Sequence, residues 1–492
     1  MSQVSTEPVR SLIPARMDRL PWARFHWMIV VGLGVSWILD GLEIQIVSAS
    51  GFQQTLRMTT EEVTLAATVY LAGQVVGALT FGRMTDKLGR KKLFILTLAI
   101  YLIGSGVAGL APSVDNKFVG IVFLYVFRFI AGLGIGGEYT AINSAIDELI
   151  PAKYRGRVDI AVNGTYWGGA MIGATANLFL LNPAYFPESW GWRIGFFIGP
   201  LMGLIIIFLR RAIPESPRWM LTHGHAEEAT AIVDDIEEGF RKQGIKLADV
   251  PPEKTMLVKA QEKLPASVLA HVFFKKYPSR TFLGITMMVT QSFLYNAIFF
   301  TYALVLQNFY HISKSGTSWY FFPFAVGNLL GPLILGPLFD TIGRRKMIFA
   351  TYAIAAVTLA VSAFLFNANV LSAATHTVFW CIAFFFASAG ASSAYLTVSE
   401  IFPLEVRGQA ISYFFAVAQI AGLTAPAIYG ALIGDASSRT PLFIGYLIGA
   451  AIMLFGGIVA LIWGVAAERK GLEDVADPLS KVSEDGEPVA MS

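Results

Sequence analysis

The chain has 492 residues, of which 55% are hydrophobic and only 14% are charged, and its formal net charge is +3. A soluble domain carries about 25% charged residues, so this composition excludes an ordinary soluble protein and indicates one that lies largely in lipid. The small net charge does not indicate a nucleic-acid partner, and the single cysteine, Cys381, excludes an intramolecular disulfide and a cysteine metal cluster.

Several apolar stretches reach the ~20 residues that a helix needs to cross a bilayer. In chain order, twelve such stretches cover residues 25–48, 62–82, 93–112, 118–141, 158–181, 192–210, 280–308, 318–339, 347–366, 375–398, 409–433 and 441–466. Backbone polar groups in lipid must be paired within the segment, so each stretch is predicted to be a helix. The sequence therefore predicts an all-α membrane protein with twelve transmembrane helices.

Lysine and arginine are distributed unequally between the two sides of the predicted membrane. With both termini inside, all but six of the 37 fall on the cytoplasmic side; the exceptions are Arg57, Lys117, Arg128, Arg193, Lys314 and Arg439. This asymmetry predicts cytoplasmic termini, in a bacterial inner membrane or a plasma membrane. No signal peptide is expected, because residues 1–24 are polar and the next apolar run is too long for a cleavable one.

Two segments of the chain occur twice. GRMTDKLGRKK (82–92) returns as GPLFDTIGRRK (336–346), and DELIPAKYRG (147–156) returns as SEIFPLEVRG (399–408). Asp340 lies 254 residues after Asp86, and Glu400 lies 252 residues after Glu148. Internal duplication in a helical membrane protein indicates alternating access. We therefore expect two pseudo-symmetric six-helix bundles, at 25–210 and 280–466.

The remaining segments are an N-terminus (1–24), a linker (211–279) and a tail (467–492), all expected in the cytoplasm. In the linker, apolar residues from Ala226 to Phe240 recur at helical spacing, and acidic residues including Glu237 are assigned to the other faces. This pattern predicts an amphipathic helix, in a linker rather than a binding domain. The polar tail contains Pro478 and Pro488 and is expected to be disordered.

Three ionisable residues lie inside predicted spans, where charge is costly and usually functional. Asp40 and Glu43 share a face of the first span, and Arg128 lies in the fourth. At ~1.5 Å per residue, Asp40 lies ~12 Å and Arg128 ~15 Å from the outer end, so this estimate slightly favours Asp40 as the partner of Arg128. Protonation of the acid would release the arginine, which couples proton entry to conformational change. The alternative is a permanent buried ion pair.

Further charged residues recur at the predicted cytoplasmic ends of spans. We expect Glu148 to pair with Arg155 and Glu400 to pair with Arg407, in a network that forms when this side is closed. Positive loops that only fix the orientation are the alternative. The candidate gating residues are Asp86, Arg90, Glu138, Glu148, Arg155, Asp340, Arg344, Glu400 and Arg407.

At these residues the sequence resembles the major facilitator superfamily, over roughly residues 25–466. GRMTDKLGRKK matches its signature between the second and third spans, and DTIGRRK matches the weaker copy. PESPRW (214–219), RG (155–156) and SEIFPLEVRG resemble sugar porters and their relatives, the organic-ion and aromatic-acid symporters. The resemblance implies two six-helix bundles around a central solute site. The porter pattern G-Y-D falls on Gly41, Leu42 and Glu43, and it favours Glu43 as the partner of Arg128. Residues 40–43, D-G-L-E, also resemble the D-G-x-D of aromatic-acid symporters, which carries two acids. Both Asp40 and Glu43 therefore stay candidates.

The same resemblance implies solute contacts in the middle of the spans. The porter's Q-Q-x-x-x-x-N falls on Thr290, Gln291 and Asn296, its span-five glutamine on Asn163, and the end of its G-P-x-x-W on Tyr395. Tyr166, Trp167, Tyr295 and Tyr302 are expected to add aromatic surface, with ordinary helix packing as the alternative. Amides and aromatics suit hydroxyl-rich or aromatic solutes.

Together these features predict a monomeric secondary transporter that imports a small polar organic solute, such as a sugar, polyol or organic or aromatic acid, with protons. No cofactor, no metal site and no enzymatic activity are expected, because the sequence contains no P-loop and no metal-ligand spacing of histidines. The alternatives are a uniporter, an exporter of the same fold, and a nutrient receptor that binds its solute without transporting it.

Overall fold

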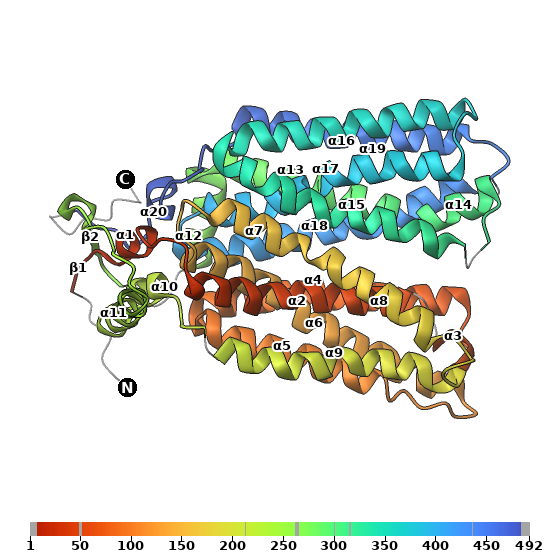
Figure 1. Cartoon of the computed structure of the whole chain (residues 1–492), viewed down its shortest axis with the longest axis horizontal. Helices are drawn as coiled ribbons and strands as arrows, with labels where there is room; N and C mark the ends of the chain where they lie inside the picture. The colour runs from red at the N-terminus through yellow and green to blue at the C-terminus, as the bar shows by residue number, and fades with distance from the viewer. Residues whose placement is uncertain are drawn as a thin grey trace.

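The computed structural model describes residues 7–48, 52–211, 213–260, 265–299, 301–313, 316–434 and 436–483. These residues form two bundles of long helices that lie side by side, with a group of short elements at one end (Figure 1). That end carries the linker and both termini, and it is called the linker end below.

The long helices follow the apolar stretches of the sequence. The N-terminal bundle contains α2 (Arg24–Ser48), α4 (Thr60–Leu88), α5 (Arg90–Ala108), α6 (Lys117–Leu149), α7 (Arg155–Gly164), α8 (Tyr166–Leu180) and α9 (Glu188–Arg211), with the short α3 (Phe52–Thr55) at the opposite end. The C-terminal bundle contains α13 (Pro278–Phe299), α14 (Tyr302–Tyr310), α15 (Thr317–Thr341), α16 (Arg344–Asn367), α17 (Ala373–Glu400), α18 (Leu404–Ile433) and α19 (Thr440–Trp463).

The described residues contain 11 helical stretches that are long and apolar enough to cross a membrane. The fifth predicted span is absent from this set because it is divided at Thr165 into α7 and α8, which are each too short alone. With these two helices counted as one span, the prediction of an all-α protein with twelve spans in two six-helix bundles is confirmed.

The two bundles repeat one packing pattern. In the N-terminal bundle α2 packs on α8, α4 on α6 and α5 on α9; in the C-terminal bundle α13 packs on α18, α15 on α17 and α16 on α19. Some of these contacts bring two backbones together. A Cβ added to Gly169 of α8 would lie 1.8 Å from the carbonyl oxygen of Ile38 in α2, so only glycine fits there.

The linker end is built from all three polar segments of the chain. It contains α1 (Ile13–Asp18), α10 (Pro217–Thr222), α11 (Ala226–Lys242), the 3₁₀ turn Pro252–Lys254, α12 (Ala266–His271), the π-helical turn Val272–Lys276 and α20 (Leu472–Val475). Strand β1 (Val9–Ser11) pairs antiparallel with β2 (Met256–Val258), and Val258 also forms a bridge with Lys481. The N-terminus, the linker and the tail are thus joined by backbone pairing.

The expected disorder of the tail is wrong for residues 467–483. Glu405, at the start of α18, accepts hydrogen bonds from the backbone N–H groups of Leu479 (3.0 Å) and Ser480 (2.9 Å). Ser480 is fully buried. Polar composition indicates disorder when a segment has nothing to pair with, but here a buried carboxylate and the strand β2 supply the partners. Residues 484–492 lie outside the described residues.

Helix α11 buries its apolar face against the N-terminal segment. Ala229, Val233 and Phe240 pack in one cluster with Ile13 and Met17. The buried stripe also includes an acid, Glu237, which the sequence analysis assigned to another face.

Glu237 is buried because it follows Ala229 and Val233 at helical spacing and because two arginines satisfy its carboxylate. It accepts hydrogen bonds from Arg16 Nε (2.9 Å) and Arg19 Nη2 (2.6 Å). Burial alone would raise the pKa of the Glu237 carboxyl, but the two arginines lower this pKa below its usual range.

Candidate functional site

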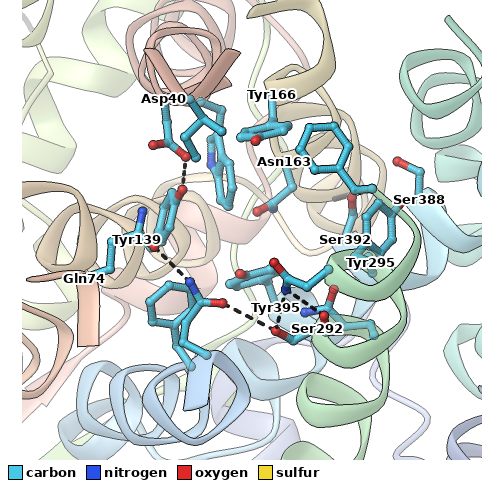
Figure 2. A pocket seen from close by; sticks show the side chains of 18 of the residues that line it. Asp40, Gln74, Tyr139, Asn163, Tyr166, Ser292, Tyr295, Ser388, Ser392 and Tyr395 are labelled. Atoms are coloured by element: carbon cyan, nitrogen blue, oxygen red, sulfur yellow. Dashed lines mark hydrogen bonds between the residues drawn. The ribbon is translucent and has the colours of Figure 1, made fainter. Parts of the chain in front are cut away.

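A cavity of about 180 Å³ lies between the two bundles. Helices α2, α4, α6, α7 and α8 line one side, and α13, α17 and α18 line the other (Figure 2). Its lining consists of Trp37, Asp40, Ile44, Leu71, Gln74, Tyr139, Asn163, Tyr166, Trp167, Gln291, Ser292, Tyr295, Asn296, Phe299, Ser388, Ala391, Ser392, Tyr395, Phe415 and Gln419. Residues from both halves of the chain therefore meet at one site.

Most of the residues predicted to contact the solute lie in this lining: Asn163, Tyr166, Gln291, Tyr295, Asn296 and Tyr395. Tyr302 does not, and its ring stacks on Phe324 at a centroid distance of 6.0 Å. The reason is local, because α13 ends at Phe299 and α14 begins at Tyr302. The break removes the helical spacing that would have placed Tyr302 on the same face as Tyr295.

The lining contains aromatic side chains that the sequence analysis missed. Trp37 and Tyr139 stack with ring centroids 4.4 Å apart, and the ring of Tyr395 from the other bundle lies 5.6 Å from Trp37. Trp167 of α8, which the sequence analysis did propose, lies 6.0 Å from Tyr295 of the other bundle. Trp37 was detectable in principle, because it precedes Asp40 by three residues and so shares its helix face.

Asp40 is a buried carboxylate in the cavity lining. The hydroxyl of Tyr70 donates a hydrogen bond to its Oδ1 at 2.8 Å. The hydroxyl of Tyr139 donates one to its Oδ2 (Figure 2). No ion pair of Asp40 is found in the described part of the chain. Asp40 is therefore a carboxylate held by neutral donors, next to the space where a solute would bind.

Glu43 and Arg128 form a buried ion pair with each other. The guanidinium of Arg128 also lies over the ring of Tyr70, 4.0 Å from its centroid. Neither Glu43 nor Arg128 lines the cavity. The depth estimate had slightly favoured Asp40 as the partner of Arg128, and the structure instead brings Glu43 to it.

A second buried ion pair joins Glu138 of α6 to Arg210 of α9. Arg210 also donates a hydrogen bond to the hydroxyl of Ser36 in α2. Glu138 was a gating candidate, but these three residues all belong to the N-terminal bundle, so the pair does not connect the bundles. No partner for Arg210 was predicted, because it lies at the end of a span, where arginine usually only fixes the orientation.

At the linker end, the duplicated motifs form matching ion pairs inside each bundle. Arg90 donates to Glu148 through Nε (3.1 Å) and Nη2 (2.6 Å). Arg344 donates to Glu400 through Nε (2.9 Å) and Nη2 (3.0 Å). All four side chains are almost fully buried.

The second arginine of each repeat crosses to the other bundle. Arg155 lies 3.7 Å from Glu400, and Arg407 lies 3.8 Å from Glu148. The predicted pairing of Glu148 with Arg155 and of Glu400 with Arg407 is therefore wrong. It assumed that each repeat closes on itself, whereas each acid receives one arginine from its own bundle and one from the other.

Further contacts join the bundles near this crossed network. The carboxylate of Asp340 accepts hydrogen bonds from the backbone N–H (3.0 Å) and the Nε (3.1 Å) of Arg157. Closer to the cavity, Ser412 donates to the carbonyl of Ala78. The bundles are thus closed against each other at the linker end. The side chain of Asp86, the counterpart of Asp340, lies outside the described residues.

Comparison with known proteins agrees with this architecture. The family of sugar (and other) transporters matches residues 41–477. The niacin transporter NiaP of Acinetobacter baylyi is 25% identical over 472 residues, which cover 94% of this chain and 99% of the relative. Myo-inositol transporter 2 of Schizosaccharomyces pombe is 28% identical over 422 residues, which cover 81% of this chain and 72% of the relative.

The fold is similar to that of a solved transporter. The structure of the proton:xylose symporter XylE bound to 6-bromo-6-deoxy-D-glucose has a TM-score of 0.76 and 18% sequence identity, and the match covers 92% of this chain and 98% of that chain. The family match spans most of the chain, from the first transmembrane helix to the tail. The chain therefore belongs to the family of sugar (and other) transporters, within the major facilitator superfamily, and is a membrane transporter rather than an enzyme.

Proposed function

We propose that this protein imports a small polar organic solute together with protons, by alternating access. The linker end is assigned to the cytoplasm, because all but six of the 37 lysines and arginines belong to the segments on that side. With the linker end closed, the cavity takes solute from the opposite side, and opening of the linker end releases it. The relatives support a bacterial inner membrane, and each chain, with both halves present, acts as a monomer.

The charge arrangement around the cavity carries the proposal of proton coupling. The N-terminal bundle holds three neighbouring acids, and two of them, Glu43 and Glu138, are neutralised by Arg128 and Arg210. Within the described residues, Asp40 has only tyrosine hydroxyls as partners. A buried charge without a counterion is costly, so among these three acids Asp40 is the one for which proton uptake removes the largest penalty. We assign Asp40 as the proton carrier and Glu43 with Arg128 as a structural pair.

The crossed ion pairs supply the conformational part of the cycle. Arg155 with Glu400 and Arg407 with Glu148 exist only while the bundles meet at the linker end. They stabilise the state that is open to the outside or occluded, and their loss accompanies opening toward the cytoplasm. Solute and proton can bind to both states. They shift this equilibrium only if they bind more tightly to one state than to the other.

The test uses purified protein in proteoliposomes that contain a pH-sensitive dye. Sugars, polyols, carboxylates, amides and amines are added one at a time, to the wild type and to Asp40→Asn and Glu43→Gln. We expect one class to acidify the lumen, and we expect Asp40→Asn to abolish the acidification while solute exchange continues. Glu43→Gln is expected to lower the amount of folded protein rather than the ratio of protons to solute.

Two results would contradict the proposal. Uptake of solute without proton movement in the wild type would indicate a uniporter. Proton movement that survives in Asp40→Asn and disappears in Glu43→Gln would assign the carrier to the ion pair with Arg128.

A further inference from the structure

The charge of the cavity lining restricts what can bind there. Asp40 is the one carboxylate in the lining, and no lysine, arginine or histidine is present among the described residues that line it. The nearest buried guanidinium groups, those of Arg128 and Arg210, are paired with Glu43 and Glu138 and do not reach the lining. A carboxylate solute would therefore lose its hydration at a site that offers no cation to replace it.

The lining also offers hydrogen-bond acceptors in excess. Each oxygen of Asp40 accepts one tyrosine hydroxyl, and a carboxylate has room for about four donors in total. Asn163 donates through its Nδ2 to Asn143 (3.1 Å) and to the carbonyl of Asp159 (2.7 Å). Its Oδ1 is buried and has no hydrogen-bond partner among the residues that the structure describes. Figure 2 shows Asp40 and Asn163 on the same side of the cavity. A bound molecule that supplies N–H donors would satisfy both residues.

The shape and surface of the cavity favour an aromatic ring. Eight of its lining residues are aromatic, and they come from both bundles: Trp37, Tyr139, Tyr166, Trp167, Tyr295, Phe299, Tyr395 and Phe415. Aromatic rings pack on one another in offset or edge-to-face arrangements, which adds to the gain from burial. The volume of about 180 Å³ is that of a small molecule, since an engineered cavity of about 150 Å³ holds benzene.

We propose that the solute is a small amide or amine with a single aromatic ring, and that it carries no carboxylate. Its ring lies between the aromatic residues of the two bundles, and its N–H groups donate to Asp40 and to Asn163 Oδ1. This inference rests on the proposed function and narrows its solute range, because it excludes the organic and aromatic acids and places sugars second. It also agrees with a departure from the hexose pattern at Tyr395, which lines the cavity, whereas Thr290 lies outside the lining.

The test measures equilibrium binding, by calorimetry, to the full chain in lipid nanodiscs. Benzamide and benzoate form a matched pair, because the same ring carries an amide in the first and a carboxylate in the second. D-xylose represents the sugars. We expect benzamide to bind at least about tenfold more tightly than benzoate or xylose at pH 7. Asp40→Asn keeps the shape of the side chain and is expected to weaken benzamide binding by about tenfold.

Two further variants separate a binding role from a loss of folding. Asn163→Leu removes the unpaired acceptor at similar volume and is expected to weaken benzamide binding with little change in Tm. Tyr302→Leu changes an aromatic residue outside the lining and is expected to leave binding unchanged. Tighter binding of benzoate or xylose, or benzamide binding that is indifferent to Asp40→Asn and Asn163→Leu, would overturn the inference. Benzamide binding without proton movement in liposomes would reject only the proposed coupling.

Discussion

The crossed ion pairs predict that one arginine controls the balance between the two conformations. Arg407 is the cleanest perturbation, because Glu148 keeps its bonds to Arg90 when Arg407 is removed. Arg407 is itself 1% exposed, and its Nε and Nη1 have no hydrogen-bond partner in the described residues. Its Nη2 donates a hydrogen bond to the carbonyl of Phe402 (3.3 Å), and Glu148 at 3.8 Å is its ion-pair partner inside the closed linker end.

The size of the effect follows from this distance. Two unit charges 3.8 Å apart attract each other by about 4 kcal/mol at an effective dielectric constant of about 20. Much of this attraction is offset by the desolvation of both groups. A net coupling of ~1–2 kcal/mol remains, which changes the ratio of closed to open linker ends by about 5- to 30-fold. Arg407→Gln is therefore expected to shift the protein toward the state that is open at the linker end.

The assay is the distance between two spin labels in lipid nanodiscs. Labels at the exposed positions Lys87 and Thr341, at the linker ends of α4 and α15, report on the separation of the bundles in a Cys381→Ser background. Arg407→Gln should increase the population of long distances. Arg345→Gln is the matched control, because Arg345 is exposed and bonds to Leu461 within its own bundle. Unchanged distances in Arg407→Gln would refute the assigned role of the crossed pairs.

Two further predictions concern packing and pH. Gly169→Ala places a methyl group 1.8 Å from the carbonyl oxygen of Ile38 and is expected to cost ~1–3 kcal/mol of stability, seen as a lower Tm. Gly168→Ala is the control, because Gly168 has open space around it and its substitution should not lower Tm. Equal Tm values for the two variants would contradict the close approach of α2 and α8. The pKa of Glu237 is lowered in the folded protein. Its carboxylate therefore stabilises the packing of the N-terminal segment at every pH above the ordinary pKa of ~4.3, and this contribution is lost as the pH falls through the lowered pKa. A spin label at Glu7 should gain mobility at acid pH in the wild type and be mobile at neutral pH in Glu237→Gln; a label that stays immobile in both would disprove the link.

The fold could be predicted from the sequence because each determinant is local. Apolar length marks the spans, and the repeated DKLGRKK and DTIGRRK loops mark the duplication. Gly89 and Gly343 show how these loops work, since both have positive φ (85° and 109°) at the turn between two helices. The linker end was less predictable, because strand β1 forms only when β2 supplies its partner, more than 200 residues later in the chain.

The candidate site was predictable only in part. Asp40 was identified because charged residues are rare in spans, and Asn163 and Gln291 were identified because they fall on the porter pattern. The aromatic Trp37 and Tyr139 were missed because aromatic residues are common in spans. The partner of Arg128 depends on the rotation of α2 by a fraction of a turn, which hydropathy does not report. The crossing of Arg155 and Arg407 depends on the contact between the bundles, and no signal within one repeat specifies it.

The crossed pairs have the form of a symmetric dimer interface inside one polypeptide. In an isologous contact, residue i of one subunit meets residue j of the other, and j of the first meets i of the second. Glu148 with Arg407 and Glu400 with Arg155 obey this relation, at nearly equal separations of 3.8 Å and 3.7 Å. Two copies of a single half would therefore close against each other with one acid and one arginine apiece. The four side chains of these pairs all lie outside the covalent linker. We therefore expect the two halves to recognise each other when they are synthesised as separate chains.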